Sequence, residues 1–240
     1  MIVLNDLLEY NGMKIYQDTE MFSFSLDSVL LANFVTIRSK ITDVLDIGCG
    51  NAPIPLILST RTSAKIKGVE IQKEVYNLAY ESIKYNKLSN RIEIINQDIN
   101  DLYLELESDS FDVITCNPPY FKNLEESKKN ISEYKKIARH ELYLNLKQIC
   151  KISKKLLKNN GCLAIVQRPD RLIDIIINMK ENNIEPKRIQ FIYPKEGKES
   201  NLVLIEGRKN AKCGIKVLEP LYVHKDNGEY TKEVKNLFKN

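Results

Sequence analysis

Residues 43–60 of the chain have the sequence DVLDIGCGNAPIPLILST, and this stretch decides the fold. The apolar run at 43–47 predicts a buried strand, and the run from Pro53 to Thr60 predicts a helix, whose first turn tolerates proline. Between them, Gly48 and Gly50 let the backbone approach a ligand closely. Such a turn between a buried strand and a helix is typical of α/β proteins that bind nucleotide-like cofactors. We expect Pro53 to hold the preceding Ala52 in extended geometry.

Strand and helix patterns alternate on both sides of this stretch, which predicts an α/β fold with a parallel sheet covered on both faces. Further strands are predicted at 65–71, 91–96, 111–115 and 162–167, and further helices at 26–35, 73–88, 142–157 and 170–182. Two more strands, at 188–193 and 201–206, are separated by too few residues for a helical crossover. They should therefore pair as an antiparallel hairpin.

Length and composition predict one domain, because 240 residues with 43% hydrophobic content can bury one sizeable core. No apolar run is long enough to span a membrane, and the N-terminus lacks a basic segment followed by an apolar one. We therefore expect a soluble cytoplasmic protein that does not bind membranes. The five cysteines are scattered without a CxxC pair, which predicts packed, reduced thiols and no zinc site. With only two histidines, a Ser/His/Asp hydrolase is disfavoured.

Charge is distributed unevenly along the chain. Residues 120–160 contain eleven Lys/Arg and four Asp/Glu, whereas residues 1–50 contain three Lys/Arg and seven Asp/Glu. A basic cluster beside a catalytic pocket would attract phosphates. Lysines that merely solvate a helix face explain the same pattern, so charge alone leaves both interpretations open.

Acidic residues stand where predicted strands end, and together they suggest a cofactor site. Glu70 can accept hydrogen bonds from both ribose hydroxyls, and Asp98 can accept one from an adenine amine, although Asp98 also suits a helix N-cap. Since open α/β sheets bind ligands at the carboxyl ends of their strands, the combination is more specific than its parts. The predicted cofactor contacts here are Asp46, Gly48, Gly50, Glu70, Ile71, Asp98 and Ile99. An NAD fingerprint would need another glycine near Pro53, which disfavours a dehydrogenase.

Asn117-Pro118-Pro119-Tyr120 follows the strand at 111–115 and carries the predicted chemistry. Methylating a planar nitrogen requires the nitrogen lone pair to leave conjugation, and acceptors aimed at the amino hydrogens favour this change. Asn117 Oδ1 and the Pro118 carbonyl can supply those acceptors, while Tyr120 can stack on the target base. We predict these four residues as catalytic, and Asn117 also as a cofactor contact. A proline turn that simply closes the strand is the structural alternative.

With these motifs, the chain resembles the class I methyltransferases that use S-adenosylmethionine, and among them the amino-methylating branch with an NPPY motif. More narrowly it resembles the tRNA1(Val) (adenine-37-N6)-methyltransferase family. The segments that carry this likeness are GMKIYQ (12–17), FSLDSVLLA (24–32), NPPYF (117–121), ARHE (138–141), PLYV (220–223) and NGEYT (227–231). The resemblance implies a Rossmann-like, mostly parallel seven-stranded sheet with an antiparallel last strand. It also implies S-adenosylhomocysteine as a product and Asp27 as a cofactor contact.

The same resemblance implies that the substrate is an adenine in the anticodon loop of a tRNA. Residues 1–42 would cover the cofactor and substrate, and residues 43–240 would form the catalytic core. The predicted substrate contacts are Tyr120, Lys122, Lys128, Lys129 and Arg139, with Lys135, Lys136 and His140 as further candidates. No metal and no obligate protein partner are expected. Ala52 departs from the family, whose members often carry glycine there, and a backbone with negative φ would accept alanine.

Other functions remain compatible with the sequence. The NPPY motif also suits enzymes that methylate a release-factor glutamine, a DNA adenine or ribosomal RNA. Outside the methyltransferases, the alternatives are a catalytically idle RNA-binding module and a dinucleotide-dependent oxidoreductase.

Overall fold

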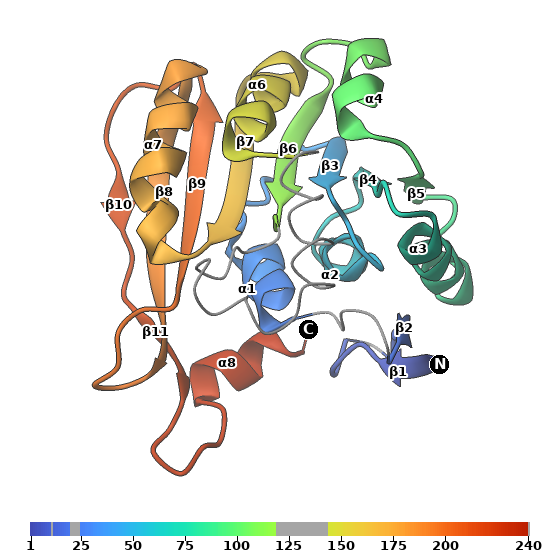
Figure 1. Ribbon diagram of the computed structural model, residues 1–240, viewed down its shortest axis with the longest axis vertical. Coiled ribbons are helices and arrows are strands. Elements are labelled where there is room, and N and C mark those ends of the chain that lie inside the picture. Colours follow the sequence, from blue (N-terminus) through green and yellow to red (C-terminus); the bar gives the residue numbers. More distant parts are fainter. Residues whose placement is uncertain (11, 20–24, 119–143, 240) are drawn as a thin grey trace, which may run out of the picture.

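The computed structural model describes residues 1–10, 12–19, 25–118 and 144–239, and its centre is a nine-stranded sheet between two layers of helices (Figure 1). The strands are β1 (Ile2–Asp6), β2 (Lys14–Asp18), β3 (Asp43–Ile47), β4 (Lys65–Val69), β5 (Ile92–Ile95), β6 (Phe111–Cys116), β7 (Leu157–Gln167), β8 (Ile184–Lys195), β9 (Leu202–Lys209), β10 (Lys216–Val217) and β11 (Leu221–His224). The helices are α1 (Leu26–Phe34), α2 (Pro53–Arg61), α3 (Lys73–Tyr85), α4 (Ile99–Glu105), α6 (Leu146–Leu156), α7 (Leu172–Glu181) and α8 (Lys232–Leu237), with a 3-10 turn, η2, at Pro169–Arg171.

The strand order is β10-β8-β9-β7-β6-β3-β4-β5, and β11 also pairs with β8. All seven predicted strands are present, and β9 runs antiparallel to both of its neighbours, β7 and β8. The prediction of a mostly parallel sheet with an antiparallel last strand is therefore confirmed. The sheet is two strands wider than predicted, because the short strands β10 and β11 add to the outer side of β8.

Alternate residues of the central strands point into two separate hydrophobic clusters. In β3, Val44 packs in the cluster that holds α1 and α2, whereas Leu45 and Ile47 pack in the cluster that holds α6 and α7. This two-sided burial explains why the parallel strands are almost continuously apolar. It also assigns polar residues to a face, since Asp46 points to the side of α1 and α2.

The helix predicted at 142–157 begins at Leu146, because Asn145 and Gln148 form a reciprocal capping box. Residues 142 and 143 lie outside the described part of the chain. Seven-residue helix α4 and six-residue helix α8 were not predicted, and neither was the hairpin of β1 and β2. These elements are short, so their hydrophobic periodicity is weak.

The β1–β2 hairpin packs against α3 and reaches the glycine turn. Asn86 joins the two by accepting from Lys14 N and donating to Lys14 O, and Ser82 Oγ accepts from Tyr16 N at 2.9 Å. On the other side of β2, Asn51 Nδ2 donates to the Tyr16 carbonyl at 2.9 Å. The hairpin is therefore fixed beside the loop between β3 and α2.

The geometry predicted for Ala52 is wrong. Its φ is +72° and its ψ is +36°, in the left-handed region, although it precedes a proline. The Ala52 amide donates to the Cys49 carbonyl at 2.9 Å, and the Ala52 carbonyl accepts from Leu56 N at 3.1 Å. These bonds close the turn and start α2, and they outweigh the preference of a pre-proline residue for extended geometry.

The cysteines are free, as the sequence predicted, and four of the five are buried. Burial raises the pKa of the Cys49, Cys116 and Cys162 thiols well above its ordinary value, and that of Cys150 to about 12. Cys213 is exposed.

No helix in the described ranges is both long and apolar enough to cross a membrane, and the described residues contain no cluster of ligands that would hold a metal ion.

Candidate active site

Three loops meet at the carboxyl ends of β3, β4 and β5, and hydrogen bonds join them. The Cys49 amide donates to the Val69 carbonyl at 3.0 Å, and the Gly50 amide donates to Glu70 Oε2 at 3.1 Å. Asn96, after β5, donates from Nδ2 to the Glu70 carbonyl at 2.8 Å. The sequence-predicted cofactor residues of these strands therefore lie at one edge of the sheet, where open α/β sheets bind their ligands.

Asp46 is a buried carboxylate at the end of β3, with one oxygen partnered and the other not. Its Oδ1 accepts from Thr115 Oγ1 at 2.6 Å, and among the described residues Oδ2 has no hydrogen-bond partner. Burial raises the pKa of Asp46 to about 7, with the hydrogen bond from Thr115 lowering it and the nearby Glu70 charge raising it. A buried acceptor without a partner is costly, so this position favours a ligand that brings a donor or a positive charge.

Glu70 links the glycine turn to the start of α3. Its Oε2 accepts from Gly50 N, and its Oε1 accepts from Gln72 N at 2.9 Å. Because a carboxylate has about four acceptor sites, these two bonds leave capacity for hydroxyl donors. Ile71, the next residue, is 36% exposed at the same edge.

Asp98 is the N-cap of α4, which was the structural alternative considered for it. Its Oδ1 accepts from both the backbone and the side-chain nitrogen of Asn100, at 2.8 Å and 2.9 Å. The following Ile99 is buried. Capping fixes the position of the Asp98 carboxylate just after β5. It therefore lies at the same carboxyl edge of the sheet as Glu70 and the glycine turn.

Asn117 follows β6 and contacts α1. Its Nδ2 donates to Ser28 Oγ at 3.1 Å, and Ser28 is buried in the first turn of that helix. This bond fixes the orientation of the Asn117 amide and puts Oδ1 on the opposite side of the amide carbon. Pro118 is buried, and Asp27, beside Ser28, is half-buried. Both the predicted catalytic asparagine and the predicted covering residue thus lie at the N-terminal end of α1.

Several predicted residues fall outside the described part of the chain. They are Pro119, Tyr120, Lys122, Lys128, Lys129, Lys135, Lys136, Arg139 and His140.

Sequence reasoning missed three residues that organise this edge: Ser28, Asn96 and Thr115. Ser28 and Thr115 act through contacts with residues 89 and 69 positions away in the chain, and no local pattern reveals such a contact. Asn96 carried a signal, since it is a polar residue directly after a buried strand.

The groups at this edge fit S-adenosylmethionine. Asp46 and Glu70 offer carboxylates to a cation and to hydroxyls, and Ile71 and Ile99 offer apolar contact for an adenine ring. Gly48 and Gly50 have positive φ, and a Cβ built on either would meet nothing within 4 Å. The backbone beside these glycines is therefore open to a ligand.

The fold, the glycine turn and the acidic residues at the strand ends together indicate one class of protein, the methyltransferases. Residues 38–212 match the model of the methyltransferase domain family. The chain belongs to this family, as its motifs predicted. Relatives that align with nearly the whole chain carry a more specific name. A tRNA1(Val) (adenine(37)-N6)-methyltransferase of Flavobacterium psychrophilum is 27% identical over 95% of each chain. A protein of the same name from Bacteroides thetaiotaomicron is 28% identical over 97% of this chain and 95% of its own.

Solved structures share the fold. A predicted O-methyltransferase of Agrobacterium tumefaciens superposes with a TM-score of 0.70 at 20% identity, covering 88% of this chain and 95% of that one. A geranyl diphosphate C-methyltransferase of Streptomyces coelicolor, solved with S-adenosyl-L-homocysteine, gives a TM-score of 0.57 at 11% identity over 76% of each chain. The class I methyltransferase fold predicted from the sequence is thereby confirmed.

Proposed function

We propose that this protein transfers the methyl group of S-adenosylmethionine to the exocyclic N6 of adenine 37 in the anticodon loop of tRNA1(Val). One observation carries the proposal: relatives that bear this name align with 95% or more of the chain. Asn117 also stands beside the glycine turn, since β6 and β3 are neighbours in the sheet.

We assign the cofactor to the carboxyl edge of β3, β4 and β5. Asp46 would balance its positive charge from below the glycine turn, Glu70 would accept the ribose hydroxyls, and Asp98 would accept from the adenine amine. When bound, S-adenosylmethionine supplies a methyl group on a positively charged sulfur. Residues 1–42 would cover this edge, with Asp27 near the methionine end, because the hairpin and α1 flank the glycine turn.

Asn117 and Pro118 would activate the target nitrogen by geometry. The adenine N6 lone pair is conjugated with the ring, so it is a poor nucleophile while the amino group is planar. Two acceptors, Asn117 Oδ1 and the Pro118 carbonyl, would bind the amino hydrogens in the orientation that frees the lone pair. Ser28 supports this role because it binds Nδ2 at 3.1 Å and so sets which way Oδ1 points. Tyr120 would stack on the base and hold it in line with the methyl group.

The RNA must turn adenine 37 out of the loop stack to reach this position. Turning out an unpaired loop base costs less than opening a base pair, so an anticodon loop is a suitable target. Lys122, Lys128, Lys129 and Arg139 remain the proposed phosphate contacts next to the catalytic turn. Charge reversal at Lys128 and Lys129 should weaken tRNA binding in a salt-dependent way.

Nucleoside mass spectrometry tests the proposal. Unmodified tRNA1(Val) is incubated with methyl-labelled S-adenosylmethionine and either the wild-type protein or Asn117→Ala. The proposal expects labelled N6-methyladenosine at position 37 from the wild type and a collapse of turnover in the variant. S-adenosylhomocysteine calorimetry on both proteins checks that the cofactor site is intact. Cofactor binding without label would reject the tRNA target and leave glutamine, ribosomal RNA and DNA adenine to be assayed. Near-normal turnover by Asn117→Ala would reject the catalytic assignment.

A further inference from the structure

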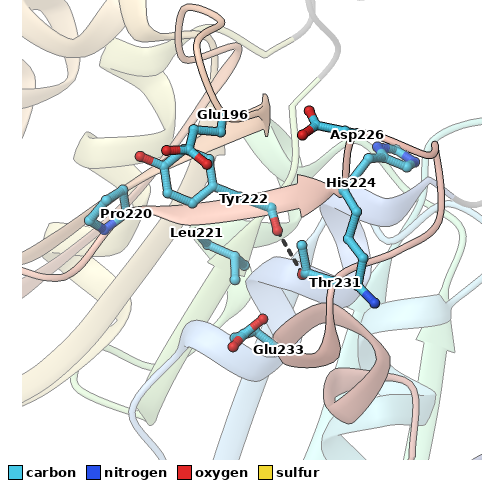
Figure 2. A pocket seen from close by; sticks show the side chains of 9 residues that line it. Glu196, Pro220, Leu221, Tyr222, His224, Asp226, Thr231 and Glu233 are labelled. Atoms are coloured by element: carbon cyan, nitrogen blue, oxygen red, sulfur yellow. Dashed lines mark hydrogen bonds between the residues drawn. The ribbon is translucent and has the colours of Figure 1, made fainter.

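Two pockets are lined by residues from the C-terminal part of the chain, apart from the proposed cofactor site, and they differ in charge. The first, of about 430 Å³, lies between β11 and α8, and Figure 2 shows Glu196, Asp226 and Glu233 around it. Thr231 Oγ1 donates to the Tyr222 carbonyl at 2.7 Å there and fixes the start of α8 on β11. Three carboxylates against one lysine in its lining would repel a phosphate, so this pocket does not suit a nucleic-acid backbone.

The second pocket, of about 460 Å³, is lined by residues of the outer strands β8, β9 and β10 and of the segment before β10. These strands stand on the left of Figure 1. Its charged lining consists of Lys187, Arg188, Glu206, Arg208 and Lys216. Four cations face one carboxylate, so the lining carries a net charge of about +3. We call this second pocket the basic pocket.

The one carboxylate of this lining is fully buried and already occupied. Glu206 Oε2 accepts from Arg188 at 3.1 Å and from Thr36 N at 2.9 Å, and Glu206 Oε1 accepts from Arg208 at 3.2 Å. A single carboxylate balances only one of the two guanidinium groups. It also holds both of them in place. Arg188 further donates to the Phe34 carbonyl and to Thr36 Oγ1, and Arg208 donates to the Asn160 carbonyl, so each guanidinium keeps only part of its five donors for phosphate oxygens.

The two lysines are not explained by this ion-pair network. Lys187 donates to the Lys212 carbonyl at 3.0 Å, which leaves its charge unbalanced, and neither Lys187 nor Lys216 forms an ion pair with another described residue. A purely structural role, tying α1 to β8 and β9, needs Arg188, Glu206 and Arg208 only. The additional lysines raise the positive charge of the pocket without serving that role.

Helix α1 connects the basic pocket to the proposed catalytic turn. Ser28, at one end of the helix, contacts Asn117, and Thr36, just past the other end, contacts Glu206 and Arg188. Six helical steps lead from Ser28 to Phe34, the last residue of α1, which is about 9 Å along the helix axis, and Thr36 follows two residues later. An RNA whose base lies at Asn117 can therefore place a phosphate of the same loop or of the adjoining stem at the basic pocket.

We propose that Lys187, Arg188, Arg208 and Lys216 bind a backbone phosphate of the RNA substrate, a few nucleotides from the methylated base. This inference rests on the proposed function for the identity of the RNA. Its chemistry, a fixed guanidinium pair flanked by two lysines, suits phosphate oxygens and is independent of base sequence. The site would orient the RNA and add affinity without discriminating between sequences.

The test uses Lys187→Glu/Lys216→Glu, which leaves the Glu206 network intact. The control, Lys65→Glu/Lys84→Glu, makes the same change in net charge at two exposed lysines on β4 and α3, away from the pocket. Fluorescence anisotropy with labelled unmodified tRNA gives the affinity of each protein between 50 and 200 mM salt. We expect the pocket variant to bind about tenfold more weakly than the control, with a salt dependence reduced by about one to two phosphate contacts. S-adenosylhomocysteine affinity should stay unchanged, and Lys216→Glu alone serves if the double variant does not fold.

Each outcome decides the proposal. Equal tRNA affinity of the pocket variant and the control would overturn it, even when nucleoside mass spectrometry shows the wild type to methylate tRNA. Absence of any tRNA binding by the wild type would overturn it together with the proposed function. Calorimetry with inorganic phosphate separates the two sources of this chemistry. Phosphate binding that the pocket variant loses, with tRNA affinity unchanged, would assign the pocket to a free anion and reject the RNA.

Discussion

Replacing Gly68 with alanine should damage the cofactor site by steric overlap, chiefly with Cys49. Gly68 lies in β4 beside Asp46 of β3, and a Cβ there would stand 2.8 Å from Cys49 Sγ, 3.1 Å from Cys49 Cβ and 2.8 Å from Ile94 Cδ1. The end of the Ile94 side chain can rotate away. Cys49 cannot do so easily, because it is buried between Gly48 and Gly50 and its amide is bound to the Val69 carbonyl.

The expected magnitude follows from this asymmetry. Overpacking of this kind costs about 1–3 kcal/mol, and the glycine turn must shift to relieve it. We expect Gly68→Ala to lower the free energy of unfolding by that amount in urea denaturation. If about 1.4 kcal/mol of the strain must be restored when the cofactor binds, the S-adenosylhomocysteine affinity measured by calorimetry falls about tenfold.

A double-mutant cycle identifies the contact. Cys49→Ala removes Sγ, so Gly68→Ala/Cys49→Ala should recover about 1 kcal/mol relative to the sum of the two single changes. Cofactor affinity should recover with it. Strict additivity of the two changes, in both stability and affinity, would refute the assignment of the clash to Cys49.

Three further predictions concern other parts of the site. Burial raises the pKa of Asp46 to about 7, so without cofactor the folded protein keeps a proton that the unfolded chain loses near pH 4. The free energy of unfolding should therefore fall as pH rises from about 4 to about 7. Affinity for S-adenosylmethionine, whose positive charge an ionised Asp46 would balance, should rise over pH 6–8 in calorimetry, and Asp46→Asn should lose this rise. Ser28→Ala should lower kcat about tenfold or more while leaving cofactor affinity unchanged, since it removes the hydrogen bond that Ser28 Oγ accepts from the Asn117 amide; equal kcat in steady-state assays would contradict this. Glu206→Gln should destabilise the fold by ~3 kcal/mol in urea denaturation, because two guanidinium groups lose their counter-charge, and a loss below 1 kcal/mol would argue against the network.

The sequence predicted those parts of the fold in which apolar runs are buried on both sides. The bounds of β3 were predicted to the residue, and β6 was one residue longer than expected. The two-residue strand β10 and the exposed strand β1 lack such runs and were missed. Local pattern recognises an element only when burial imposes a period on enough consecutive residues.

The residues of the candidate site also fall into those that the sequence could predict and those that it could not. Asp46, Glu70 and Asn117 were predictable, because each follows or ends a buried strand and the topology of a parallel sheet brings such positions together. Ser28 and Thr115 were not, since their importance depends on which distant side chain they meet. The error at Ala52 had another cause: a local steric preference was outweighed by two backbone hydrogen bonds of the turn.

The distribution of the cysteines makes the protein suited to labelling at one position. Four thiols are buried, and burial raises their pKa, so they react slowly with maleimides in the folded state. Cys213 is exposed and is followed directly by Gly214 in the lining of the basic pocket. A single fluorophore can therefore be attached beside that pocket without any mutation, and its emission would report directly whether RNA arrives there.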